Sequence, residues 1–152
     1  EAISPRKPER PSWLIPILLA LAALVAAAIV GFLLITRGNS AKAARIDAVR
    51  SSIQTFDAAV RNGDLAALRN VTCGQTRDTY VNYDDKAWAD AYSKISEAKQ
   101  YPVVASIDEV VVNGEHAEAN VTSYMAFDPT TTSTRSFDLQ LRDDQWKICQ
   151  SS

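Results

Sequence analysis

Apolar residues follow one another without interruption near the N-terminus. From Trp13 to Ile35 the chain holds no charged residue, and this run of about 23 residues would measure about 34 Å as a helix. A hydrocarbon core is about 30 Å thick, so residues 13–36 are predicted to form a transmembrane helix. Residues 1–12 are then an N-terminal segment, and residues 37–41 form a polar joint.

Two other interpretations of this run are a buried core helix and a cleaved signal peptide. A core helix would carry polar residues on one side, whereas this run is apolar on every side. A signal peptide ends in small residues of the A-x-A kind, which the residues after Ile35 do not provide. We therefore expect a retained anchor. Its small residues Ala23, Ala27 and Gly31 would let another helix pack closely against it, although bacterial spans commonly use alanine.

Beyond the joint, apolar residues at three- and four-residue steps predict a long helix over about residues 41–61. These residues are Ile46, Val49, Ile53, Phe56 and Val60. The stripe also fits a heptad, but it spans too few heptads to favour a self-associating coiled coil over packing on a sheet. Asn62 and Gly63 end this helix, and Asp64 is the predicted cap of a short helix over residues 65–70.

A second helical region follows a turn around Cys73. Asp84 is its predicted N-cap, and Trp88 and Tyr92 recur on one helical face. Pro102 ends the helical part, and beyond it the apolar period changes from about 3.6 residues to about 2. The change in period marks the start of a sheet.

Four strands are predicted, joined as an antiparallel meander. The first covers residues 103–112 and the second residues 115–127, with a hairpin turn at Asn113-Gly114 between them. A loop over residues 128–132 precedes two further strands, which carry the alternating apolar residues Phe137, Leu139, Leu141, Trp146 and Ile148. Helices followed by an antiparallel sheet define an α+β domain over residues 42–152.

The two-residue turn also predicts which side chains of the first hairpin face the helices. It pairs Asp108 with Ala119 on the apolar face, while Glu109 and Glu118 lie opposite each other on the face toward solvent. Asp108 is then the one carboxylate that faces inward, where a neighbouring tyrosine would let it act as a general base. The candidate pocket consists of Trp88, Tyr92, Asp108 and Val110.

The charge of the predicted domain and its candidate catalytic residues disfavour several classes of function. From Gly38 onward the chain has 12 Lys or Arg against 16 Asp or Glu, and an acidic domain disfavours nucleic acid as a partner. The single histidine, His116, lies beside the hairpin turn and is predicted to face water, so no Ser-His-Asp set is expected. We find no phosphate-binding glycine loop, no metal-ligand set and no cofactor motif in the sequence.

Two cysteines, Cys73 and Cys149, lie in the predicted domain. In a small extracytoplasmic domain such a pair usually forms one disulfide, and the alternative is two separate buried thiols. A zinc site would need more ligands than these cysteines and one distant histidine. Strand alternation directs Cys149 away from Trp146 and Ile148, so a bridge requires either a path around a sheet edge or a bulge in the last strand.

The cysteines also orient the anchor, which charge does not. Arg6, Lys7 and Arg10 precede the apolar run, and Arg37, Lys42 and Arg45 follow it, so the positive-inside rule is nearly balanced. A disulfide forms in an oxidising compartment. If the bridge exists, the N-terminus is cytoplasmic, and the domain lies outside the cell membrane.

The order of these features resembles the nuclear transport factor 2-like fold. The pieces are a helix broken at Asn62-Gly63-Asp64, the turn at Thr72-Cys73-Gly74, a long Asn-Gly hairpin and a terminal Trp146-Lys147-Ile148-Cys149. More narrowly, the chain resembles single-pass membrane proteins of mycobacteria and related actinobacteria, namely the lumazine-binding-like and Mce-associated ones. The resemblance implies a cone-shaped fold of helices and curved sheet, and service in a cell-envelope complex, but no reaction.

These inferences predict a non-enzymatic accessory subunit on the outer face of a membrane complex. Its partners would be the lipid bilayer and an integral membrane protein complex. One alternative is a transport accessory that binds a lipid or small molecule, which requires a deep cavity. A second is a dehydratase- or isomerase-like enzyme that uses Asp108, which requires that residue to face an open cavity.

Overall fold

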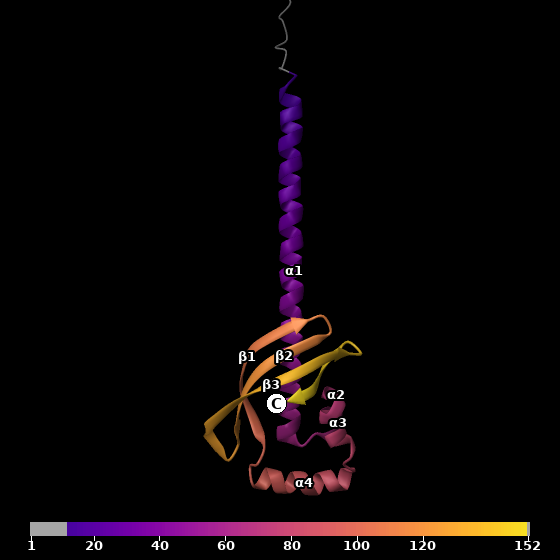
Figure 1. The fold of residues 1–152 in the computed structure, drawn as a ribbon, viewed down its shortest axis with the longest axis vertical. Helices are drawn as coiled ribbons and strands as arrows, with labels where there is room; N and C mark the ends of the chain where they lie inside the picture. Colours follow the sequence, from indigo (N-terminus) through magenta and orange to yellow (C-terminus); the bar gives the residue numbers. More distant parts are fainter. Residues whose placement is uncertain (1–11, 152) are drawn as a thin grey trace, which may run out of the picture. The chain divides into compact units, whose positions relative to one another are not determined.

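The computed structural model describes residues 12–151, with the side chain of Ser151 left aside (Figure 1). Apart from its last residue, the predicted N-terminal segment 1–12 lies outside the described residues. The chain divides into two compact units directly after Ala41, and each is considered by itself.

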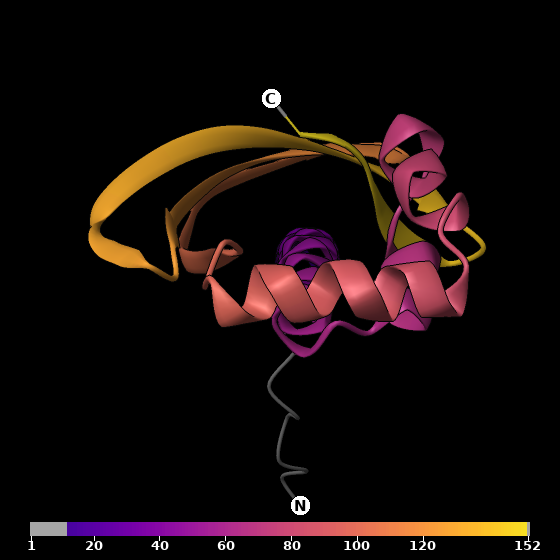
Figure 2. The ribbon, with the colours of Figure 1, turned by 90° about the horizontal axis from the view of Figure 1, so that it is seen from below.

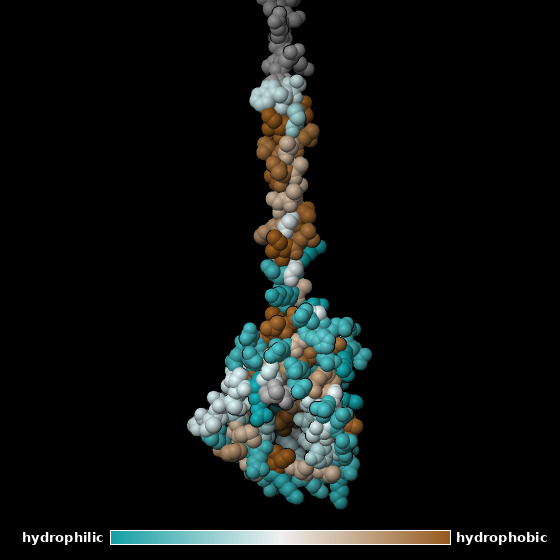
Figure 3. Space-filling view, viewed as in Figure 1, coloured by the Kyte–Doolittle hydropathy of each residue, from teal (hydrophilic) through white to brown (hydrophobic). Residues whose placement is uncertain are grey.

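Helix α1 spans Leu14–Asn62 and contributes to both units. Its large apolar side chains from Leu14 to Ile35 are exposed, and Figure 3 shows this surface as mostly hydrophobic. Among the described residues, α1 is the one helix long and apolar enough to cross a membrane, although a signal sequence near the N-terminus would have the same properties. Residues 37–41, the predicted joint, are helical.

Three short helices follow α1 in the second unit. They are α2 (Leu65–Val71), α3 (Gly74–Val81) and α4 (Asp85–Glu97). The predicted caps are confirmed, because the Asp64 carboxylate accepts the Ala67 N–H at 3.0 Å and the Asp84 carboxylate accepts the Ala87 N–H at 2.7 Å. Each cap satisfies an N–H group that the first turn of a helix would otherwise leave unpaired.

One antiparallel sheet in the order β1-β2-β3-β4 completes the domain. Its strands are β1 (Pro102–Asn113), β2 (His116–Met125), β3 (Asp128–Arg142) and β4 (Gln145–Ser151). The sheet arches over the part of α1 that follows Ala41 (Figure 2). The predicted loop at residues 128–132 is instead the beginning of β3, which suits its threonines because β-branched side chains favour strands.

The predicted register of the first hairpin is wrong by two residues. The turn is formed by Gly114 and Glu115, so Val110 lies opposite Ala119. Two irregularities in β1, between Val104 and Ser106 and between Ile107 and Glu109, shift the pairing further. Each such bulge inserts an unpaired residue and reverses the face that later side chains occupy, which sequence alternation alone does not reveal.

The core lies between α1 and the concave face of the sheet. Val49 and Ile53 of α1 are fully buried against sheet residues Ala117, Ala119, Val121, Leu139, Trp146 and Ile148. The predicted stripe on α1 and the predicted inward side chains of β3 and β4 therefore meet as expected. Burying them stabilises the domain, because each apolar side chain removed from water contributes about 1.5–3 kcal/mol.

Candidate functional site

A cavity of about 500 Å³ opens beneath the far end of the β2–β3 hairpin. Its lining comes from α1, the start of β1, and the β2–β3 hairpin. The lining residues are Phe56, Pro102, Ser123, Tyr124, Met125, Phe127, Asp128, Thr131, Thr132, Ser133, Arg135 and Phe137. The volume is within the range of about 300–1,000 Å³ that is typical of small-molecule sites.

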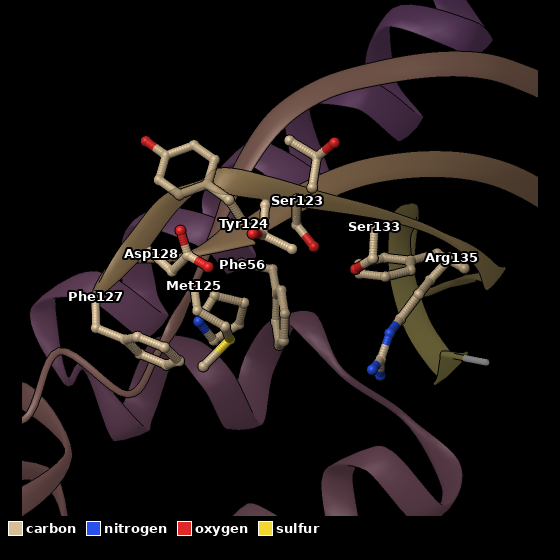
Figure 4. Close-up of a pocket in the computed structure, with 12 residues that line it drawn as sticks. Phe56, Ser123, Tyr124, Met125, Phe127, Asp128, Ser133 and Arg135 are labelled. Carbon is tan, nitrogen blue, oxygen red and sulfur yellow. The ribbon is translucent and has the colours of Figure 1, made fainter.

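The floor of this cavity is aromatic. Phe56 of α1 meets Phe137 of β3 edge to face, with ring centroids 6.2 Å apart. In Figure 4, Phe56 lies between Arg135 on one side and Met125 and Phe127 on the other. The cavity thus has an apolar surface along its length and a guanidinium at one side.

The cavity carboxylate, Asp128, is engaged by its own neighbours. Its Oδ1 accepts the Thr130 hydroxyl at 2.9 Å. Hydrogen bonds from Thr131 and Thr130 hold the pKa of Asp128 below its ordinary value. A carboxylate with a lowered pKa is a weak general base and stays ionised at neutral pH.

The structure does not assemble the candidate pocket predicted from the sequence. Trp88 and Tyr92 belong to α4 and line a separate surface depression with Gly63. The Trp88 indole N–H donates to the Gly63 carbonyl at 2.8 Å, and the Tyr92 hydroxyl donates to the Arg61 carbonyl. These bonds hold α4 across the C-terminal end of α1 (Figure 1). Both aromatic residues therefore fix the position of α4.

The aromatic residues around Trp88 form a small cluster of their own. The Trp88 ring stacks on Tyr92, with centroids 6.1 Å apart, and meets Tyr80 and Tyr83 edge to face. Burial raises the pKa of the Tyr80 hydroxyl, because the phenolate form loses hydration inside the cluster. The cluster packs α3 against α4.

Asp108 is exposed rather than directed inward, which corrects the prediction for this residue. It lies at the second irregularity of β1, where its carboxylate accepts the Ser106 hydroxyl at 2.6 Å and the Thr122 hydroxyl at 2.5 Å. These two bonds, with a smaller effect of the Arg50 charge, hold the pKa of Asp108 below its ordinary value. Val110 packs against the core, and neither Val110 nor Asp108 lines the cavity of about 500 Å³.

The two irregularities of β1 are bound by polar side chains of α1. The Arg50 guanidinium donates to the Ile107 carbonyl at 2.7 Å, and the buried Asp57 carboxylate accepts the Val104 N–H at 2.9 Å. Asp57 also pairs with Arg61 at 2.8 Å. Each contact gives a hydrogen-bond partner to a backbone group beside an irregularity of β1.

The structure joins Cys73 and Cys149 in a disulfide, with Cα atoms 4.3 Å apart. Of the two routes that the sequence left open, the structure shows the bulge in the last strand. β4 is an edge strand, and Cys149 is the extra residue where the pairing shifts between Asp138 and Leu139. The Cys73 N–H donates to the Ile148 carbonyl at 2.8 Å, so the bridge closes beside an existing backbone bond.

The remaining predicted residues are His116 and the three small residues of α1. His116 is exposed, as predicted. Ala23, Ala27 and Gly31 lie on α1, and an added Cβ at Gly31 would meet nothing within 4 Å. Their contact with another helix remains a prediction.

Sequence reasoning missed the cavity, although it identified two of the rings in it as core residues. Arg135 carried the available signal, because it occupies an inward position in the alternation that runs through Phe137, Leu139 and Leu141. A charge at an inward position indicates an opening in the core.

An arched antiparallel sheet that wraps a long helix and encloses a cavity defines an α+β cone. The solved structures that resemble it are of the nuclear transport factor 2-like, or NTF2-like, class. One is a variant of a protein named Rd1NTF2_05, with 12% identity and a TM-score of 0.51 over 70% of this chain and 96% of that one. The chain therefore has the NTF2-like fold.

Two natural proteins with this fold are also similar in structure. An NTF2-like protein of unknown function from Shewanella oneidensis is 16% identical, with a TM-score of 0.49 over 69% of this chain and 94% of that one. A protein of the NTF2-like family from Streptomyces avermitilis is 14% identical, with a TM-score of 0.45 over 70% and 92%. No protein-family model and no curated protein matches the chain.

Proposed function

We propose that the protein is a single-pass, non-enzymatic accessory subunit of a cell-envelope membrane complex, with its NTF2-like domain outside the cytoplasm. The observation that carries the membrane assignment is the exposed apolar surface of α1. Every large apolar side chain from Leu14 to Ile35 is exposed, and a bilayer would provide apolar surroundings for this surface.

The disulfide supports the orientation. Cys73 is 2% exposed and bonded to Cys149, and such bridges persist in oxidising compartments. The bridge therefore supports a domain outside the cytoplasm and an N-terminus inside it.

The acid–base groups of the domain support a non-enzymatic role. Asp108 is an exposed carboxylate with two hydroxyl partners, and His116 is exposed at the hairpin turn. Asp128, at the cavity, has a lowered pKa. A general acid or base works best with a pKa near the operating pH, which these environments do not favour for either carboxylate.

Thiol labelling in intact cells tests the orientation. In Ser93→Cys the new thiol lies on α4 and is exposed, whereas Ser4→Cys lies before the anchor. A membrane-impermeant maleimide should label Ser93→Cys in intact cells and Ser4→Cys only after permeabilisation. Labelling in the opposite order, or release of the domain into the soluble fraction, overturns the proposal.

Co-purification of the full chain in mild detergent tests the accessory role. The variant Ala23→Leu with Ala27→Leu should lose the companion protein, because larger side chains prevent close helix approach. The matched control is Ala22→Leu with Ala26→Leu, which adds the same volume on a face rotated by about 100°. A wild-type chain that purifies as a monomer without a companion contradicts the accessory role.

A second candidate function, binding of a small molecule or lipid, is favoured by the cavity. The sequence left this alternative open on the condition that the core contains a cavity. The volume of about 500 Å³ and the aromatic floor formed by Phe56 and Phe137 support it.

A further inference from the structure

The two sides of the cavity differ in charge and polarity. Arg135 is the one cationic side chain among the 12 that line it, and Met125 and Phe127 lie on the other side of Phe56 (Figure 4). A guanidinium recognises a carboxylate through two parallel N–H donors. An apolar floor beside such a group suits a ligand that carries its anion at one end.

Arg135 is available for this contact. Within the described residues 12–151, its side chain donates no hydrogen bond to a protein acceptor and forms no ion pair, and it is exposed at the cavity. By contrast, Arg142 of the same strand donates to the Gln140 side chain at 2.7 Å. A free guanidinium at an inward strand position therefore needs an anion or water to satisfy its donors.

The acidic group of the cavity lies far from this cation. Met125 pairs with Asp128 and Val121 pairs with Arg135 across β2 and β3. These two partners are four residues apart on β2, so about 13 Å separates the two positions along that strand. Asp128 already accepts the Thr130 hydroxyl. Its charge directs an anion toward Arg135 and not toward the other end.

The charge of the whole domain limits the kind of anion. From Gly38 onward the 16 acidic residues exceed the 12 basic residues, and a negative field disfavours ligands with several negative charges. One negative charge is compensated by one arginine, and the rest of the affinity must come from apolar contact.

From these observations we propose that the cavity binds an organic carboxylate with a single negative charge and an apolar body. Arg135 pairs with the carboxylate, and Phe56, Phe137 and Met125 hold the apolar body. Hydroxyls of Ser123 and Ser133 lie at the same cavity and supply the few polar contacts that fix orientation. The inference rests on the binding alternative above and is independent of the membrane complex.

Calorimetric titration of the full chain in nanodiscs of uncharged lipid tests this site, with empty nanodiscs as the blank for partitioning. The probes are naphthoate, decanoate, and naphthylmethylamine, which keeps the rings and reverses the charge. Wild type should bind both carboxylates saturably and bind the amine more weakly. Equal affinity for naphthoate and the amine, or an absence of saturable binding, overturns the proposal.

The matched substitutions are Arg135→Gln and Arg142→Gln, which remove the same charge from one strand. Arg135→Gln should weaken naphthoate binding by at least about tenfold, equivalent to about 1.4 kcal/mol. It should not weaken binding of the amine, because the cation that repels the amine is removed. Arg142→Gln, outside the cavity, should bind as wild type does. If the two variants have the same affinity, the site is elsewhere.

A third variant tests the cavity itself. Ser123→Leu adds apolar volume at the lining and should remove binding of every probe, while circular dichroism confirms that the fold is retained. If Ser123→Leu fails to fold, Arg135→Gln and Arg142→Gln still decide the proposal. Failure of ligand binding leaves membrane labelling and co-purification unchanged, so the two proposals fail separately.

Discussion

Opening the disulfide is expected to destabilise the domain strongly. Cys73 and Cys149 are separated by 76 positions in the sequence, so the bridge closes most of the domain into one loop. On the chain-entropy description, closing such a loop stabilises the folded state by about 4.5 kcal/mol relative to the open unfolded chain. Few single contacts in a domain of this size contribute as much.

The double substitution Cys73→Ala with Cys149→Ala removes the bridge without adding a buried hydroxyl. In a domain of about a hundred residues, each kcal/mol changes the melting temperature by about 4 °C. The expected fall is therefore about 15–20 °C for the full chain in nanodiscs, followed by circular dichroism of the domain.

Reductant provides the control. It should lower the melting temperature of wild type to that of the double variant and leave the variant unchanged. The neighbouring backbone bond from the Cys73 N–H to the Ile148 carbonyl is kept in both proteins. If the double variant melts within about 4 °C of wild type, loop closure does not stabilise the domain as the chain-entropy description requires.

Three further predictions follow from single contacts. Asp57→Asn should cost about 1–3 kcal/mol in chemical unfolding, because it removes a buried charge that accepts the Val104 N–H. Asp108 has a lowered pKa when folded, so it favours the folded state above its ordinary pKa of 3.8, and this contribution is lost as the pH falls through the lowered value. Melting of Asp108→Asn should therefore depend less on pH in that acidic range, and a carboxyl NMR titration of wild type should give a midpoint below 3.8. Gly63→Ala should lower stability by at least about 1 kcal/mol in urea unfolding, because φ is +66° and the new Cβ would lie 2.6 Å from the Tyr92 ring.

The features predicted correctly from the sequence are those fixed by near neighbours. Asp64 and Asp84 cap helices because each carboxylate reaches an N–H three residues later. The break after Asn62 follows from Gly63, which adopts positive φ. These effects need only a few consecutive residues, so a single sequence contains them.

The features predicted wrongly depend on residues far apart in the chain. The prediction that Asp108 faces inward was wrong because β1 has two bulges that the strand pattern does not show. Arg50 and Asp57, which lie on α1, hold these bulges. The predicted pocket was wrong for the same reason, because it depended on an inward Asp108. The cavity that exists combines α1 with three strands, and its cation, Arg135, lies on a strand whose start was interpreted as a loop.

The contacts of Arg50 and Asp57 also determine how α1 is registered on the sheet. Seven helical residues separate them, a rise of about 10.5 Å, and their backbone partners Val104 and Ile107 are three strand residues, or about 10 Å, apart. The two spacings match only when helix and strand run in opposite directions. The apolar stripe alone would tolerate sliding by one turn, whereas such a slide would separate both Arg50 and Asp57 from their backbone partners on β1. Two polar side chains thus select one alignment among several that the hydrophobic core would accept.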